Sequence, residues 1–124
     1  IVDGERIENQ KELNIQVDNF ETACDLIKNL GCEEKAFQVS KRELWKLDGV
    51  EVTLDEWPYL EPFVEIEGES EEAVRTVAEK LGFDYSKALF CAVDTLYAQK
   101  YGISKEQINN QTPVIDFDQP NPFV

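Results

Sequence analysis

An Asp48–Gly49 pair between two stretches of alternating side chains is the feature that most restricts the fold of this chain. The stretches Phe37–Leu47 and Val50–Asp55 each place polar and apolar residues on alternate sides, which is the pattern of a β-strand. Asp-Gly is a favoured two-residue loop because both positions tolerate the left-handed backbone of a type I′ turn. The sequence therefore predicts an antiparallel hairpin.

Strands and helices are predicted on both sides of this hairpin. Two further stretches alternate like strands, Glu5–Val17 and Phe63–Glu67. Three stretches have apolar residues at helical spacing and begin at a capping residue: Asp18 to Gly31, Ser70 to Gly82, and Ser86 to Gly102. A short helical turn is expected after Ser104, and residues 109–124 contain three prolines without a helical period. This mixture predicts an α+β fold.

The composition excludes several classes of function. With 124 residues the chain is one small domain, and 42% hydrophobic residues suffice for a folded core. A net charge of -14 disfavours nucleic acid duplexes as partners, and the absence of histidine excludes histidine-based triads and histidine-ligated zinc. No apolar run is long enough for a membrane span. The three cysteines form no Cys-x-x-Cys motif, so we expect free thiols in a reducing cytoplasm.

Two glutamates within an apolar strand are candidate metal ligands. Glu65 and Glu67 alternate with Phe63, Val64 and Ile66, so both carboxylates project from one face. Two like charges this close repel unless a cation lies near them, and a divalent metal ion held by carboxylate oxygens would supply one. The alternative is a solvated acidic surface, because ten acidic residues and no basic residue lie between Lys46 and Arg75.

Asp55 and Arg42 could belong to the same site. Asp55 shares a face with Glu51 and Thr53, and would join the acidic cluster if its strand pairs near Glu65. Arg42 would then supply a cation from a third strand, and carboxylates for a metal with a base for phosphate are what a polyphosphate site needs. The alternative for Arg42 is a cross-strand salt bridge that contributes little.

These residues resemble a known family. The order and spacing of Arg, Leu-Asp and Glu-Ile-Glu closely resemble the second half of the CYTH domain, which is named for class IV adenylate cyclase and thiamine triphosphatase and belongs to the triphosphate tunnel metalloenzymes. The stretches that carry it are KRELWKL (41–47), VTLD (52–55) and FVEIE (63–67). The resemblance covers about two thirds of the chain. It implies an antiparallel β-barrel or tunnel flanked by helices over residues 1–84, with a helical extension and tail packed on the same domain over residues 85–124.

The resemblance also implies a ligand and roles for these residues. The ligand would be a nucleoside, thiamine or inorganic triphosphate, with Mg²⁺ or Mn²⁺ as cofactor. Glu65 and Glu67 would bind the metal, Asp55 and Glu12 would complete or support the acidic side, and Arg42 would bind phosphate. Attack by water would give hydrolysis, and attack by a ribose hydroxyl would give cyclic AMP.

The chain departs from the family at one motif. The Glu-x-Glu-x-Lys signature of the family's first strand is absent, so either the N-terminal third of the domain lies outside this chain, which we expect, or the chain is a divergent half-barrel. We therefore expect no full catalysis by this chain alone, and assign no catalytic residue. Pairing with the missing strands, or a homodimer, would cover the open sheet edges. A non-catalytic phosphate- or nucleotide-binding module and an acidic interaction protein are the competing interpretations.

Overall fold

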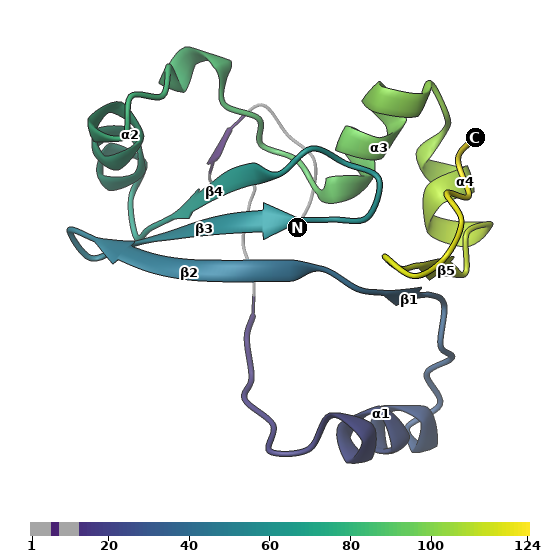
Figure 1. Cartoon of the computed structure of the whole chain (residues 1–124). Helices are drawn as coiled ribbons and strands as arrows, with labels where there is room; N and C mark the ends of the chain where they lie inside the picture. The colour runs from purple at the N-terminus through teal and green to yellow at the C-terminus, as the bar shows by residue number, and fades with distance from the viewer. Residues whose placement is uncertain (1–5, 8–12) are drawn as a thin grey trace.

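The structure is a computed structural model that describes residues 6–7 and 13–124. Its helices are α1 (Phe20–Asn29), α2 (Glu71–Lys80), α3 (Val93–Tyr101) and α4 (Lys105–Asn110), with a 3₁₀ helix over Tyr85–Lys87. Its strands are β1 (Phe37–Gln38), β2 (Lys41–Leu47), β3 (Val50–Glu56), β4 (Phe63–Glu67) and β5 (Val114–Ile115). Figure 1 shows a central sheet with α2 at one end, α3, α4 and β5 at the other, and α1 set apart.

The central sheet is antiparallel and has the strand order β2–β3–β4. Asp48 and Gly49 join β2 to β3 with φ values of 52° and 80°, which is the left-handed backbone that a type I′ turn requires. The predicted hairpin is therefore confirmed. Because helices accompany this antiparallel sheet, the α+β class is confirmed as well. Within the described residues the sheet is open, as fits part of a tunnel, and does not close into a barrel.

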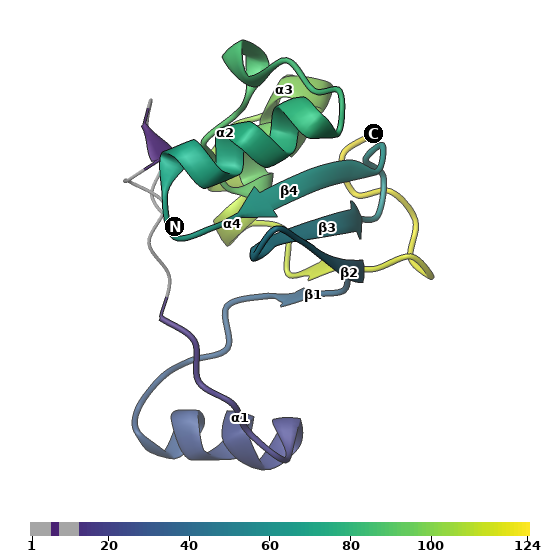
Figure 2. The same cartoon turned by 90° about the vertical axis from the view of Figure 1, so that its left-hand side faces the viewer.

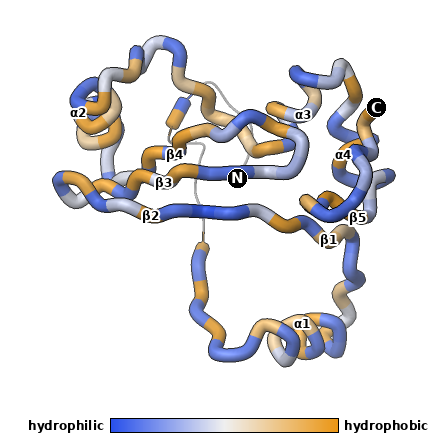
Figure 3. The backbone as a smooth tube through the Cα atoms, in the orientation of Figure 1, coloured by the Kyte–Doolittle hydropathy of each residue, from blue (hydrophilic) through white to orange (hydrophobic). Residues whose placement is uncertain are grey.

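One face of the sheet is covered by α2. Val77 and Ala73 of this helix pack against apolar strand residues, namely Leu47, Val50, Val52, Val64 and Ile66. The side chain of Ser70 accepts a hydrogen bond from the Ala73 N–H, so the predicted cap of α2 is confirmed. Figure 2 shows α2 lying along β4 and β3, and Figure 3 shows that the middle of β2 is hydrophilic. Arg42, Asp55 and Glu65 alternate onto the face away from α2, which we call the charged face.

A second core lies where the C-terminal segment meets the loop between β3 and β4. Its buried members are Tyr97, Ile108, Ile115 and Phe123. Trp57, Tyr59 and Leu60 of the loop pack against them. The segment also adds β5, which runs parallel to β1 and pairs Val114 with Phe37. The proline-containing tail is thus packed on the rest of the fold.

Three expected element boundaries differ from the structure. Residues 13–17, the described end of the expected strand Glu5–Val17, form no strand, and Leu13 is fully exposed there, because alternation favours extended backbone but supplies no pairing partner. Asn19 caps α1 in place of Asp18, with its side chain accepting a hydrogen bond from the Thr22 N–H at 2.8 Å. Ser86 does not begin α3. Its N–H donates a hydrogen bond to the side chain of Asp84, which caps the short 3₁₀ helix Tyr85–Lys87.

Helix α1 differs from α2 in that none of its ten residues is buried. Both views show it away from the sheet (Figures 1 and 2). Its apolar residues Phe20 and Leu26 and its C-cap Leu30 have 71%, 60% and 76% of their surface exposed. No helix in the described part of the chain is long and apolar enough to span a membrane.

Candidate functional site

Arg42 and Asp55 form the centre of the charged cluster. They are direct partners in the register of β2 and β3, so their side chains leave the same face of the sheet. The Nε and Nη2 of Arg42 donate hydrogen bonds to the two carboxylate oxygens of Asp55 at 2.6 and 3.0 Å. Asp55 is only 1% exposed, whereas the Arg42 side chain is 47% exposed. A buried carboxylate is thus held by a guanidinium whose other side reaches the surface.

Thr53 completes the surroundings of the Asp55 carboxylate. Its hydroxyl donates a hydrogen bond to Asp55 Oδ2 at 2.7 Å, and it is itself 4% exposed. Thr53 stands two residues before Asp55 in β3, and alternation therefore places both on one face. The sequence analysis located Thr53 on this face but gave it no role. The signal that could have found it is a hydroxyl residue two positions from a buried acid within a strand.

Glu65 joins the cluster from β4. The register pairs Glu65 with Thr53, and Arg42 Nη2 donates a hydrogen bond to Glu65 Oε2 at 2.6 Å. Burial raises the pKa of Glu65 above its ordinary value of 4.5, the charge of Arg42 opposes this, and Asp55 and Glu67 add to it. The hydrogen bond with Asp55 raises the pKa of Arg42. One guanidinium therefore bridges two carboxylates. Its charge offsets only part of the rise that burial causes in the pKa of Glu65.

Glu67 lies on the same face but outside this bridge. It is exposed and pairs in register with Glu51 of β3, which in turn forms an ion pair with Lys46 at 3.1 Å. The structure thus brings together Arg42, Asp55 and Glu65 of the expected site residues and leaves Glu67 at the next position along the sheet. Glu12, the remaining expected ligand, lies outside the described residues.

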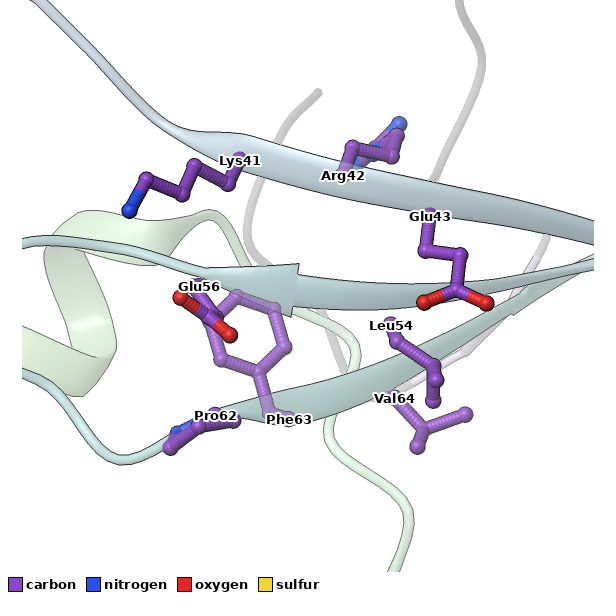
Figure 4. A pocket seen from close by; sticks show the side chains of 8 residues that line it. All are labelled: Lys41, Arg42, Glu43, Leu54, Glu56, Pro62, Phe63 and Val64. Atoms are coloured by element: carbon purple, nitrogen blue, oxygen red, sulfur yellow. The ribbon is translucent and has the colours of Figure 1, made fainter.

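A groove lies on the other face of these strands. It has a volume of about 360 Å³, and its lining residues include Lys41, Arg42, Glu43, Leu54, Glu56 and Val64. Figure 4 shows Glu43, Leu54 and Val64 pointing to one side of the sheet while Arg42 points to the other. Although Arg42 borders the groove, its side chain points away from it to Asp55 and Glu65, and we place the candidate site on the charged face.

Comparison with known proteins identifies the family. Residues 2–96, more than half of the chain, match the CYTH domain. The chain belongs to the CYTH domain family. This family is part of the triphosphate tunnel metalloenzymes, binds triphosphate small molecules and is generally metal-dependent. No curated protein and no solved structure matches the chain significantly.

The described carboxylates were tested as a metal site for this CYTH domain. Carboxylate oxygens are suitable donors for a hard divalent cation. Within residues 6–7 and 13–124, however, no three acidic or cysteine side chains come together closely enough to hold a metal ion. Arg42 already engages the carboxylates of both Asp55 and Glu65. As they are arranged, these residues do not fit a metal ion.

Proposed function

We propose that this CYTH domain binds a nucleoside, thiamine or inorganic triphosphate on the charged face of the β2–β3–β4 sheet and acts in its hydrolysis. The observation that carries the proposal is the geometry of Arg42. Its guanidinium is fixed along the Nε and Nη2 edge by Asp55, while about half of its side chain is exposed. A fixed guanidinium with an accessible edge is suited to bidentate recognition of phosphate.

Some N–H donors of Arg42 bind carboxylates of the protein, and others are left to bind a ligand. Nε and Nη2 are used by Asp55 and Glu65, and among the described residues Nη1 donates no hydrogen bond. Arginine has five N–H donors, so the Nη1 pair can reach a phosphate oxygen without loss of the Asp55 contact. Asp55 is then the residue that orients Arg42, and Thr53 holds the Asp55 carboxylate in turn.

Glu65 is the partner that Arg42 can release. Its side chain is 38% exposed, and its pKa is raised by burial despite the contact with Arg42. An approaching phosphate group would compete with Glu65 for Nη2, because both are oxygen anions and only Asp55 is fully buried. We propose that a phosphate oxygen replaces Glu65 as the acceptor of the Arg42 Nη2 hydrogen bond, and that the released Glu65 side chain stays nearby.

The metal requirement is a separate part of the proposal. We expect Mg²⁺ or Mn²⁺ to increase affinity, as is general in the family. No step is routed through a metal ion here, because the described carboxylates do not converge on one. Glu65, Glu67, Asp55 and Glu12 remain predictions as metal ligands.

The proposal is tested by binding and turnover measured on the same chain. Thermal stability and isothermal titration with tripolyphosphate, ATP and thiamine triphosphate, each with and without Mg²⁺, should show a ligand that stabilises the folded state by mass action. Arg42→Lys should weaken binding about tenfold, because lysine cannot make the bidentate contact. Lys46→Arg, on the same face, is the matched control and should bind as the parent does.

The results separate the competing functions. Binding with phosphate release supports hydrolysis and would contradict the expectation that this chain alone lacks full catalysis. Binding without turnover agrees with that expectation and with the non-catalytic binding module. Formation of cyclic AMP from ATP would indicate cyclase activity. If the Arg42→Lys variant binds as tightly as the Lys46→Arg control, Arg42 is a structural salt bridge and the proposed site is wrong. If Glu65→Gln leaves a Mg²⁺-dependent shift unchanged, Glu65 is not a metal ligand.

A further inference from the structure

The C-terminal segment from Tyr97 to Val124, beyond the residues that match the family, holds the loop between β3 and β4 through its side chains. Tyr97, which is fully buried, donates a hydrogen bond from its hydroxyl to the Pro58 carbonyl at 2.7 Å. The Tyr101 hydroxyl donates to the Tyr59 carbonyl at 2.6 Å. Lys100 pairs with both carboxylate oxygens of Glu61 at 2.9 and 3.0 Å. One face of α3 thus binds three residues of a single loop.

The loop also binds the segment in return. The Tyr59 hydroxyl lies within hydrogen-bond distance of two tail carbonyls, those of Asp116 and Gln119. Tyr59 has a φ of 66°, a left-handed backbone that a bulky side chain rarely adopts and that surrounding contacts must maintain. Burial raises the pKa of Tyr97, so its hydroxyl stays protonated and remains a donor across the physiological range.

A second set of contacts fixes the entry to β2. The N–H of Phe37 donates to the Pro113 carbonyl at 2.9 Å, and the N–H of Val39 donates to the Ile115 carbonyl at 3.0 Å. Lys41 Nζ lies 4.5 Å from the centre of the Phe117 ring. These contacts end one residue before Arg42, the first cation of the charged face.

Both sets of contacts act at the same end of the sheet. In the register, Arg42, Asp55 and Phe63 lie side by side there, and Thr53 and Glu65 are the next partners along β3 and β4. β2 and β4 each pair only with β3 among the described residues of this sheet. A slip of one residue in either would move Arg42 or Glu65 to the opposite face and leave the buried Asp55 carboxylate without its partner.

We propose that the segment Tyr97–Val124 is a clamp that positions Arg42, Asp55 and Glu65 by fixing the ends of all three strands, with Tyr97 and Tyr101 as positioning residues. This role rests on the proposed function in that the cluster it positions is the proposed triphosphate site. The segment lies outside the residues that match the family.

The clamp is tested with single hydroxyl deletions in the full chain. Tyr97→Phe and Tyr101→Phe each remove one hydrogen bond to the loop and keep the ring in its core. Tyr85→Phe, a hydroxyl deletion in the 3₁₀ helix, is the matched control. We expect the two clamp variants to bind tripolyphosphate about fivefold more weakly than the control, because each leaves a loop carbonyl unpaired, buried at Pro58 and half-buried at Tyr59, and relaxes the strand ends.

Two further readouts separate positioning from general stability. The ¹⁵N-detected Nε–H signal of Arg42 should shift or broaden in the clamp variants, and the Glu65 carboxyl should titrate at a different pH from the parent. Lower melting temperatures with an unchanged Arg42 signal, Glu65 titration and tripolyphosphate affinity would overturn the clamp. If Tyr97→Phe does not fold, the clamp is tested by Tyr101→Phe alone, because Tyr101 is only half-buried. If the parent itself binds no triphosphate, the proposed function fails, and the two spectroscopic readouts still decide whether the clamp positions the cluster.

Discussion

Arg42 and Asp55 face each other across β2 and β3, and the guanidinium of Arg42 donates to both oxygens of the buried Asp55 carboxylate. Replacing Arg42 by glutamine would leave that carboxylate buried without a charged partner. Loss of one partner of a fully buried pair costs about 3–5 kcal/mol, and because half of Arg42 is exposed we expect a loss nearer to about 2 kcal/mol in the free energy of unfolding. Urea denaturation of Arg42→Gln measures this loss.

The matched control for this prediction is Lys46→Gln. Lys46 is on the same strand and face, but its side chain is 69% exposed, and its pair with Glu51 should contribute at most about 1 kcal/mol. The double variant Arg42→Gln with Asp55→Asn should recover part of the stability, since the unpaired charge is removed. Equal losses for Arg42→Gln and Lys46→Gln would contradict a specific role for the Arg42–Asp55 pair.

The ionisation of Glu65 should destabilise the fold. Burial raises the pKa of Glu65 in the folded state above its ordinary value of 4.5. The folded state therefore binds more protons than the unfolded state between these two pKa values, and stability should fall as pH rises through that window. Above the pKa of Glu65 in the folded state, the free energy of unfolding should not fall further from this group. Carboxyl ¹³C chemical shifts recorded against pH give the pKa of Glu65 directly.

Glu65→Gln is the variant that tests this pH dependence. The variant should lose the fall in stability with rising pH that the parent shows just above pH 4.5, while the Arg42–Asp55 contact remains. Glu56→Gln, an exposed residue at the end of β3, is the control and should follow the parent curve. A parent Glu65 that titrates at or below its ordinary value would show that Arg42 outweighs burial, contrary to the prediction.

The pairing of Arg42 with Asp55 was accessible from the sequence because a two-residue turn leaves no freedom of register. With Asp48 and Gly49 in the turn, Leu47 must pair with Val50, and each step outward then leads to Arg42 and Asp55. Arg42 and Asp55 share a face with Glu65 because β4 pairs with β3 in the register that places Glu65 opposite Thr53.

Other features could not be derived in this way because they depend on contacts distant in sequence. The register of β4 follows a six-residue loop that the C-terminal segment holds, and nothing in residues 57–62 alone fixes its conformation. The pairing of β5 with β1 joins two-residue strands more than seventy positions apart, which carry no alternation to read. The alternating residues 13–17 form no strand in the described structure, since alternation does not provide a partner.

The hairpin turn itself gives a prediction on stability. Gly49 has a φ of 80°, and a Cβ added there would contact nothing within 4 Å, so any cost of substitution comes from the backbone alone. Gly49→Ala should therefore destabilise the fold by about 1 kcal/mol. Gly49→Asn should cost clearly less, because asparagine tolerates left-handed backbone. Thermal or urea unfolding compares the two variants, and equal losses would show that the turn changes type.

The exposed apolar face of α1 predicts self-association of the chain. α2, a helix of the same length, buries Val74, Val77 and Ala78, whereas α1 buries nothing. Large exposed apolar surfaces of this kind mark interaction sites. The groove of about 360 Å³, at the end of the sheet away from α2, has Leu54, 43% exposed, among its lining residues and offers an exposed apolar side chain on a second copy. We therefore expect a dimer in which α1 of one copy lies in this groove of the other.

Charge supports the same arrangement. The polar side of α1 contains two acids and one base, Glu21, Asp25 and Lys28. The charged residues that line the groove are Lys41, Arg42, Glu43 and Glu56, of which Arg42 points its side chain to the other face. An acidic helix end can thus face Lys41 while Lys28 faces the glutamates, although Lys28 must first leave its exposed pair with Glu34.

Sedimentation equilibrium over a range of concentrations measures this association. Leu26→Gln on α1 and Leu54→Gln in the groove should each weaken the dimer about tenfold, because each removes one apolar side chain from the same interface. Leu89→Gln, a leucine 61% exposed that belongs to neither surface, is the control and should associate as the parent does. Isotope-filtered spectra of mixed labelled and unlabelled chains should show contacts between Leu26 and Leu54 methyl groups of different copies. A monomer at all concentrations, or a dimer unaffected by Leu54→Gln, would rule out this groove as the partner of α1.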